Sequence, residues 1–210
     1  MSASAAEAAA VYLTQLDAAF PSPDDWSRAG PVAFCHDWQG RNPDPQRETE
    51  VRLLWTDSDL LVRFRCCYRT LDVFDDTEPN GRRNELWDRD VAEVFLQPDR
   101  FGEKFYKEFE VSPSGQWLDL DISPQGLTHI TSGMRSRVEL DAASRVWKAE
   151  LAIPMPALTS DFDPAQSWRV NFFRCEGRDP ARYYSAWQPT ETETPNFHVP
   201  GKFGALRFAR

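Results

Sequence analysis

The stretch Asn84-Glu85-Leu86-Trp87-Asp88-Arg89-Asp90-Val91-Ala92-Glu93-Val94-Phe95-Leu96 passes from a polar loop into an almost wholly apolar segment. Trp87 stands at the exit of the loop, and Glu93 is the one charged residue in the run that begins at Val91. A short run rich in Val and Phe, preceded by polar residues, is typical of a buried β-strand. The stretch therefore predicts a strand with an aromatic ring at its start and a carboxylate inside it.

Short segments of the same kind, separated by turn signals, lie on both sides of this stretch. Residues 51–55 and 60–68 flank the turn Asp57-Ser58-Asp59 and predict an antiparallel hairpin. Further strands are expected at residues 91–97, 104–111, 116–122, 135–140, 146–153, 167–175, 183–187 and 203–208. Many short strands with Gly and Pro between them, and little amphipathic helix, indicate an all-β fold: a jelly-roll-like antiparallel β-sandwich with short peripheral helices.

The beginning of the chain has a different pattern. Residues 5–20 carry four apolar residues among alanines at a loose helical spacing, and Pro21 and Pro23 then interrupt any regular element. The whole chain of 210 residues is long enough to bury a substantial core as one domain. We therefore expect an N-terminal arm or short helix over residues 1–24 and one β-sandwich over residues 25–210.

The charge and the first residues limit the partners and the location. Lys and Arg number 24 against 33 Asp and Glu, a net charge of -9, which argues against binding to a nucleic-acid backbone. Residues 1–10 hold no Lys or Arg and no apolar run of the length that a signal peptide or a membrane span needs. We expect no membrane partner and a cytoplasmic location, or a secreted one if a leader has been removed.

The four cysteines show no metal-binding spacing. Cys66 and Cys67 are adjacent, so in a strand they point to opposite faces and do not bond to each other. We predict buried thiols, with one long-range disulfide as the alternative.

Eight tryptophans exceed what a core alone usually requires, so their placement matters. Trp55, Trp147 and Trp168 are in phase with apolar neighbours and are predicted to be core residues. Trp87 and Trp187 each stand at a strand end beside polar residues. Two indoles in such places suit the flat C–H face of a sugar ring, although burial is the more frequent fate of a tryptophan.

Polar groups near these two indoles could bind the hydroxyl groups of a sugar. Glu93 is a lone carboxylate on an apolar face, where it needs a partner. Asn171 offers donors and acceptors, and Arg174 offers a fixed fork of donors. The structural alternative is that Arg174 forms an ion pair with Glu93.

An ordered set of motifs resembles carbohydrate-binding module family 9, whose members are β-sandwiches related to DOMON domains. The set comprises residues 87–95, 109–115, 147–154, 168–174, Ala186-Trp187, 195–200 and Phe203-Gly204. The resemblance covers the chain from about residue 25 to residue 208. Members are often attached to xylanases, whereas we expect this chain to be a stand-alone domain without a catalytic domain.

The resemblance implies binding of a mono- or oligosaccharide without catalysis, in xylan or other polysaccharide degradation. It implies that Trp87 and Trp187 stack on the two faces of a sugar, at the reducing end of a xylan- or glucan-type oligosaccharide. It implies that Glu93, Asn171 and Arg174 bind the hydroxyls. The resemblance implies that no cofactor is required. A structural calcium ion could be held by oxygens of Asp72-Val73-Phe74-Asp75-Asp76. We expect a monomer.

Three other functions are open from the sequence. A glycoside hydrolase needs two carboxylates at a fixed separation, for which Glu93 with Glu108 or Asp90 could serve. Related sandwiches can hold haem through Met and His, and here the candidates are His129, Met134 and His198. In a protein-interaction β-sandwich, the exposed tryptophans would instead contact a protein partner.

Overall fold

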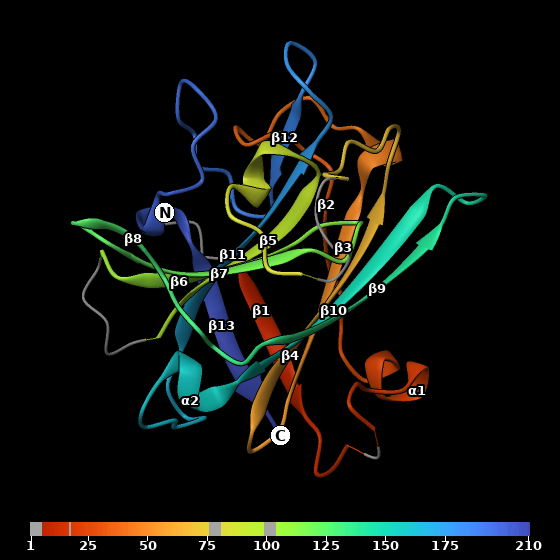
Figure 1. The fold of residues 1–210 in the computed structure, drawn as a ribbon. Coiled ribbons are helices and arrows are strands. Elements are labelled where there is room, and N and C mark those ends of the chain that lie inside the picture. Colours follow the sequence, from red (N-terminus) through yellow and green to blue (C-terminus); the bar gives the residue numbers. More distant parts are fainter. Residues whose placement is uncertain (1–5, 17, 76–80, 99–103) are drawn as a thin grey trace.

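The computed structural model describes residues 6–16, 18–75, 81–98 and 104–210. Within these ranges the chain forms one long curled sheet with the order β8-β7-β6-β5-β11-β13-β1-β3-β4-β10-β9, to which β12 adds beside β11 and β2 beside β3. Figure 1 shows how the sheet folds over, so that β9 and β10 lie away from β7 and β8. The prediction of an all-β fold is confirmed.

The strands are short and antiparallel to their neighbours, except β1, which is parallel to both β13 and β3. Their bounds are β1 Glu7–Tyr12, β2 Val32–Phe34, β3 Thr49–Trp55, β4 Asp59–Cys67, β5 Val91–Gln97, β6 Tyr106–Val111, β7 Trp117–Ser123, β8 Gly126–His129, β9 Arg135–Asp141, β10 Val146–Pro154, β11 Trp168–Glu176, β12 Tyr183–Ala186 and β13 Gly204–Ala209. Helical segments are α1 Pro23–Ser27, α2 Met155–Leu158 and the 3-10 turns η1 Pro45–Arg47, η2 Leu86–Asp88 and η3 Pro200–Lys202.

The main core lies between the two halves of the curled sheet. Trp147 from β10 and Trp168 from β11 are at most 1 % exposed there, and Trp55 at the end of β3 is buried beside them. The prediction that these three tryptophans belong to the core is confirmed. Trp55, Phe162, Trp168 and Phe208 form edge-to-face ring pairs with centroids 4.9 to 5.8 Å apart, which adds to the stabilisation that burial alone provides.

Two smaller clusters cover the outer faces of the sheet. Helix α1, whose Ser22 and Asp25 form a capping box, places Trp26 over the outer face of β3 and β4. Leu61 of β4 and Ala152 of β10 join this cluster, whereas the rest of the same face of these two strands carries charged side chains such as Arg63 and Glu150. The other outer cluster covers β5, β6, β7 and β11 and is described with the site below.

The prediction of a helix or arm at the N-terminus is wrong. Residues 7–12 form β1, which pairs in parallel with β13 and β3, so that Ala10 lies opposite both Phe208 and Leu53. In Figure 1 the red β1 runs beside the blue β13. Alanine has a low strand propensity, but Ala8 and Ala10 are buried where β1 runs between β13 and β3. Long-range pairing therefore overrides the local pattern.

The four cysteines are free thiols, as predicted. Cys66 and Cys175 are buried, whereas Cys35 and Cys67 are partly exposed. No helix in the described part of the chain has the length and apolar character needed to cross a membrane.

We predict that Ala10→Asp destabilises the protein by at least about 3 kcal/mol, because it places an unpaired carboxylate at a fully buried position of β1. Ala9→Asp is the matched control, since Ala9 is partly exposed on the other face of the same strand. Urea unfolding of both variants measures the difference. Equal and small losses would show that β1 is not an integral strand.

Candidate functional site

A cleft of about 280 Å³ opens on the outer face of β5, β6 and β11, where the C-terminal segment 195–198 and η2 rise over the sheet. Its size is close to the lower end of the range for small-molecule sites. The lining residues are Trp87, Asp88, Glu93, Glu108, Leu120, Leu127, Cys175, Arg182, Tyr184, Pro195, Asn196, Phe197 and His198. The cleft thus combines aromatic side chains with carboxyl, guanidinium and amide groups.

Strand alternation decides which residues reach the cleft. On β5, Val91, Glu93 and Phe95 face outward, and Ala92, Val94 and Leu96 enter the main core. The same alternation on β11 sends Phe173 and Cys175 outward. Phe173 then stacks on Phe197 with ring centroids 4.2 Å apart, which fixes the C-terminal segment over the sheet.

Trp87 is half-buried at the edge of the cleft in η2. The turn is held in place from below by Leu86, which is fully buried. It is also held by Arg182, whose guanidinium donates hydrogen bonds to the backbone oxygens of Trp87 and Arg89. One arginine thus fixes the backbone that presents the indole while its charge acts on the Glu93 carboxylate inside the cleft.

Three carboxyl groups cluster on the cleft side of β5 and β6. Glu93 lies opposite Glu110 across the strand pair, and Glu108 lies opposite Phe95. They are 2 %, 0 % and 3 % exposed, respectively. Burial raises the pKa of Glu108 to about 7, and burial together with the neighbouring carboxyl charges raises the pKa of Glu93 and of Glu110 well above the usual value. The buried cluster therefore holds protons near neutral pH.

His198 links this cluster to the aromatic wall. Its Nδ1 lies 2.6 Å from the Tyr106 hydroxyl and 4.0 Å from Oε2 of Glu108. Its ring is 5.4 Å from that of Phe95. Desolvation by the surrounding groups lowers the pKa of His198, so the imidazole is neutral at pH 7 and can accept a hydrogen bond from Tyr106.

Two of the five residues predicted from the sequence, Trp87 and Glu93, meet in the cleft. Trp187 does not. Its ring packs on Phe172 at 5.5 Å and belongs to the edge of the main core, on the opposite face of the sheet. The prediction that Trp187 and Trp87 face each other across a sugar is therefore wrong. Trp187 follows Ala186, which faces the cleft side, and alternation turns the next residue inward.

Asn171 and Arg174 have structural roles. The Asn171 amide is fully buried, donates to the backbone oxygen of Gln188 and accepts from the backbone nitrogens of Phe172 and Gln188, with all three distances at 2.9 Å. It fixes the strand exit after β12. Arg174 is 1 % exposed inside the sandwich, with its guanidinium 5.1 Å from the Trp147 ring centre.

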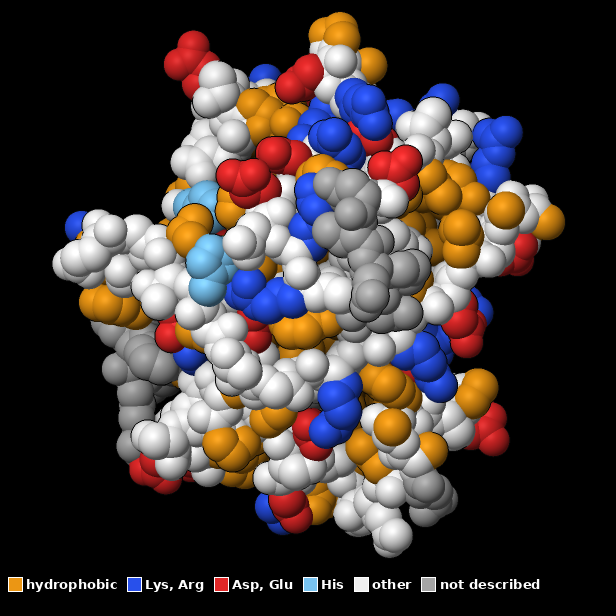
Figure 2. Space-filling view, in the orientation of Figure 1, with side chains coloured by type: hydrophobic (Ala, Val, Ile, Leu, Met, Phe, Trp, Pro, Cys, Tyr) orange, Lys and Arg blue, Asp and Glu red, His pale blue; other side chains and the backbone are white. Residues whose placement is uncertain are grey.

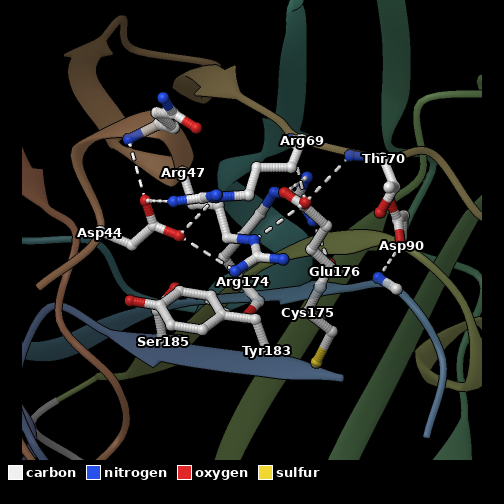
Figure 3. A network of polar contacts seen from close by, with 12 residues as sticks. Asp44, Arg47, Arg69, Thr70, Asp90, Arg174, Cys175, Glu176, Tyr183 and Ser185 are labelled. Atoms are coloured by element: carbon white, nitrogen blue, oxygen red, sulfur yellow. Dashed lines mark hydrogen bonds and ion pairs between the residues drawn. The ribbon is translucent and has the colours of Figure 1, made fainter. Parts of the chain in front are cut away.

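Arg174 belongs to an internal polar network (Figure 3). Its Nη2 lies 3.6 Å from Oε2 of Glu176, and Oε1 of Glu176 accepts hydrogen bonds from Arg47 Nε and from the backbone nitrogens of Arg69 and Thr70. The alternative considered from the sequence, an ion pair of Arg174 with Glu93, is not formed, because the two residues lie on opposite faces of the sheet. Arg174 pairs with Glu176 instead.

Several residues of the cleft had no predicted role, among them Arg182, Tyr184 and Asn196. A sequence signal was present for three other residues of this face: Tyr106, Glu108 and Glu110 alternate with inward-facing residues such as Phe109, so period two places all three on one face. Arg182, Tyr184 and Asn196 come from β12 and from loops whose path over the sheet has no local sequence signal. The face in Figure 2 mixes acidic, basic, histidine and apolar side chains without a continuous patch of one charge.

The described residues show neither of the alternative metal or haem sites. Asp72 binds the guanidinium of Arg178 at 2.5 Å and lies 3.6 Å from that of Arg89, and Asp76 lies outside the described residues. In the part of the chain that the structure describes, no group of three or more His, Cys, Asp or Glu side chains is arranged so that it could hold a metal ion. Of the three haem candidates, Met134 is buried in the main core, His129 is exposed on β8 with Arg82 at its Nδ1, and His198 lies in the cleft.

The family model for carbohydrate-binding family 9 matches residues 35–208. The chain therefore belongs to this family. An extracellular protein of Arthroderma benhamiae is 25% identical over 186 residues, which cover 80% of this chain and 81% of the relative.

Solved structures show the same fold. A Bacteroides uniformis protein proposed to bind carbohydrate has a TM-score of 0.77 at 17% identity, covering 98% of this chain and 100% of its own. A family 9 module from Caldicellulosiruptor kristjanssonii in complex with cellotriose has a TM-score of 0.68 at 15% identity, covering 97% of this chain and 94% of its own. The glucose complex of a family 9 module from the same organism has a TM-score of 0.65 at 15% identity, covering 98% and 97%.

The raised pKa of Glu108 makes stability depend on pH. The folded state holds a proton that the unfolded state loses near pH 4.5, so stability falls as the pH rises towards about 7. The Gln side chain of Glu108→Gln needs no proton. We therefore predict that the free energy of unfolding of this variant, measured relative to that of the wild type, increases by up to about 3 kcal/mol as the pH rises from 5 to 8.

Urea unfolding at the two pH values measures this change. Glu139→Gln is the control, because Glu139 is exposed on β9 and its effect should be nearly the same at both pH values. An effect of Glu108→Gln that is equal at pH 5 and pH 8 would show that Glu108 is not protonated in the folded protein.

Proposed function

We propose that this protein is a non-catalytic carbohydrate-binding module that takes one sugar residue of a glucan- or xylan-type oligosaccharide into the cleft beside Trp87. The observation that supports this most is the half-buried indole of Trp87 standing over a cleft that also holds buried hydrogen-bonding groups. Membership of carbohydrate-binding family 9 and the solved relatives in complex with glucose and cellotriose support the same conclusion.

The chemistry of the cleft suits the two kinds of surface on a sugar. The C–H face of the ring packs on the Trp87 indole, for which ring stacking on other ligands suggests about 1–3 kcal/mol. The hydroxyl groups bind the polar wall, where Asn196, Tyr184 and the protonated Glu93 supply neutral groups and Arg182 supplies a charged one. Hydrogen bonds to charged groups contribute about 1.5–3 kcal/mol each.

One aromatic platform and a few hydrogen bonds, less the cost of association, give an affinity between about millimolar and micromolar. This is sufficient for a module that holds a soluble oligosaccharide or a chain end. The second aromatic wall of the cleft comes from Tyr184, Phe197 and His198, and it takes the place that the sequence had assigned to Trp187.

We predict that Trp87→Ala weakens glucose or cellobiose binding at least about fivefold, because it removes the stacking platform. Trp187→Phe is the matched control: it keeps an aromatic ring in the core, and we expect a change of less than about twofold. Isothermal titration calorimetry with glucose, xylose and their short oligomers measures both. Undiminished binding by Trp87→Ala would contradict the proposed site.

Glycoside hydrolysis is the second candidate, favoured by one observation. Glu93 and Glu108 both line the cleft from neighbouring strands, as two catalytic carboxyl groups would. Incubation with xylo- and cello-oligosaccharides tests it. We expect no new reducing ends, and reducing ends that vanish in Glu93→Gln would establish the enzyme instead.

A further inference from the structure

The cleft carries more acidic than basic groups. Around the space between Trp87 and His198, three carboxyl groups lie on β5 and β6, and Asp88 adds a fourth at the rim. The titratable groups that line this space or lie next to its lining are Glu93 on β5, Tyr106, Glu108 and Glu110 on β6, Asp88 on η2, Cys175 on β11, Arg182 before β12, Tyr184 on β12 and His198 on the C-terminal segment. Arg182 is the permanent cation among these described residues.

Arg182 directs its Nη2 to loop backbone, and its buried Nε has no hydrogen-bond partner. Its guanidinium donates to the backbone oxygens of Trp87 and Arg89, and its charge acts on Glu93. Among the described residues, Oε2 of Glu108 and both carboxyl oxygens of Glu110 have no hydrogen-bond partner, although all three atoms are buried. Buried polar groups in folded proteins are almost always paired. Glu108 and Glu110 hydrogen-bond to each other when one of them is protonated, but one shared proton serves at most two of the three oxygens, so a further donor is missing.

The missing donor must reach Glu108 from the cleft. Glu108 is 3 % exposed and lines the cleft, whereas Glu110 lies beneath it and is fully buried. The neighbouring side chain with a ring nitrogen, His198, is 4.0 Å from Glu108 and is already bonded to Tyr106. A ligand group that brings both donors and positive charge would satisfy Glu108 and reduce the repulsion within the carboxyl cluster.

We propose that the cleft selects a sugar that carries a free, protonated amino group, with the ammonium placed at Glu108 and Glu93 while Trp87 supports the ring. This inference rests on the proposed function. An ammonium group has three donors and a compact charge, which suits two carboxyl groups on adjacent strands. N-acetylation of the amine removes the charge and two of the three donors, so an acetylated sugar should lose the preference.

The proposal has a signature in pH. Binding of an ammonium ion favours the ionised form of Glu108, which otherwise keeps its proton up to about pH 7, so binding releases a proton below that pH. A neutral hexose carries no charge that would stabilise the ionised form of Glu108. Affinity for the amino sugar should therefore rise between pH 5 and pH 7, whereas affinity for glucose should not rise in the same way.

Calorimetric titration at pH 7 and constant ionic strength, with glucosamine, N-acetylglucosamine and glucose as ligands, tests the proposal. We expect glucosamine to bind at least about tenfold more tightly than glucose and N-acetylglucosamine, which is the scale of one charge-assisted hydrogen bond. Glu108→Gln should bring the ratio of the glucosamine and glucose affinities towards one. Titration in two buffers of different ionisation enthalpy should show proton release with glucosamine.

The outcomes separate this inference from the proposed function. Glucose binding as tightly as glucosamine to the wild-type protein would overturn the inference and leave the sugar site intact. Absence of binding by any of the three sugars would overturn both. Ethylammonium is the control for charge alone: binding equal to that of glucosamine would show a cation site without sugar recognition and would also overturn the inference. Because the ratio is measured on the wild-type protein, the test holds even if Glu108→Gln fails to fold.

Discussion

The alternation of side chains along β5, β6 and β11 is the constraint on which both the fold and the site depend. These strands form a layer with two occupied faces: one set of residues enters the main core, and the other forms the floor of the cleft. A shift of one residue in register would move Glu93, Glu108 and Glu110 into the core and bring Val94 and Phe109 into the cleft. The aromatic packing between the two halves of the sheet therefore also holds the site in place.

The buried carboxyl groups show the opposing demands of stability and function. A cluster of Glu93, Glu108 and Glu110 beneath a cleft is unfavourable when ionised, and the protein accommodates it by raising their pKa values and by placing Arg182 nearby. The same polar groups would be of little use for stability alone, since apolar residues would fill these positions without cost. By contrast, the Arg174–Glu176 network is enclosed on the other face and holds loop backbone in place.

The strand pattern and the three core tryptophans could be predicted from the sequence. So could the part of the site formed by β5 and the turn before it. Trp87 and Glu93 could be predicted because a loop exit and a break in an apolar run are local features. Trp187 and Arg174 could not be assigned correctly, because their faces depend on the register between β11 and β12 and on which face the core covers. The strand β1 was missed for a related reason: its pairing with β13 joins residues about 200 positions apart, and alanines carry no local strand signal.

The central claim is that a sugar binds on the Trp87 side of the layer and not on the Trp187 side. Indole N–H signals in a two-dimensional ¹H–¹⁵N spectrum, assigned by substitution and followed during titration with glucose or cellobiose, measure this most directly. We expect the Trp87 signal to shift saturably with added sugar while the signals of Trp187 and of the buried Trp147 stay in place. A saturable shift of Trp187 with an unmoved Trp87 would contradict the account.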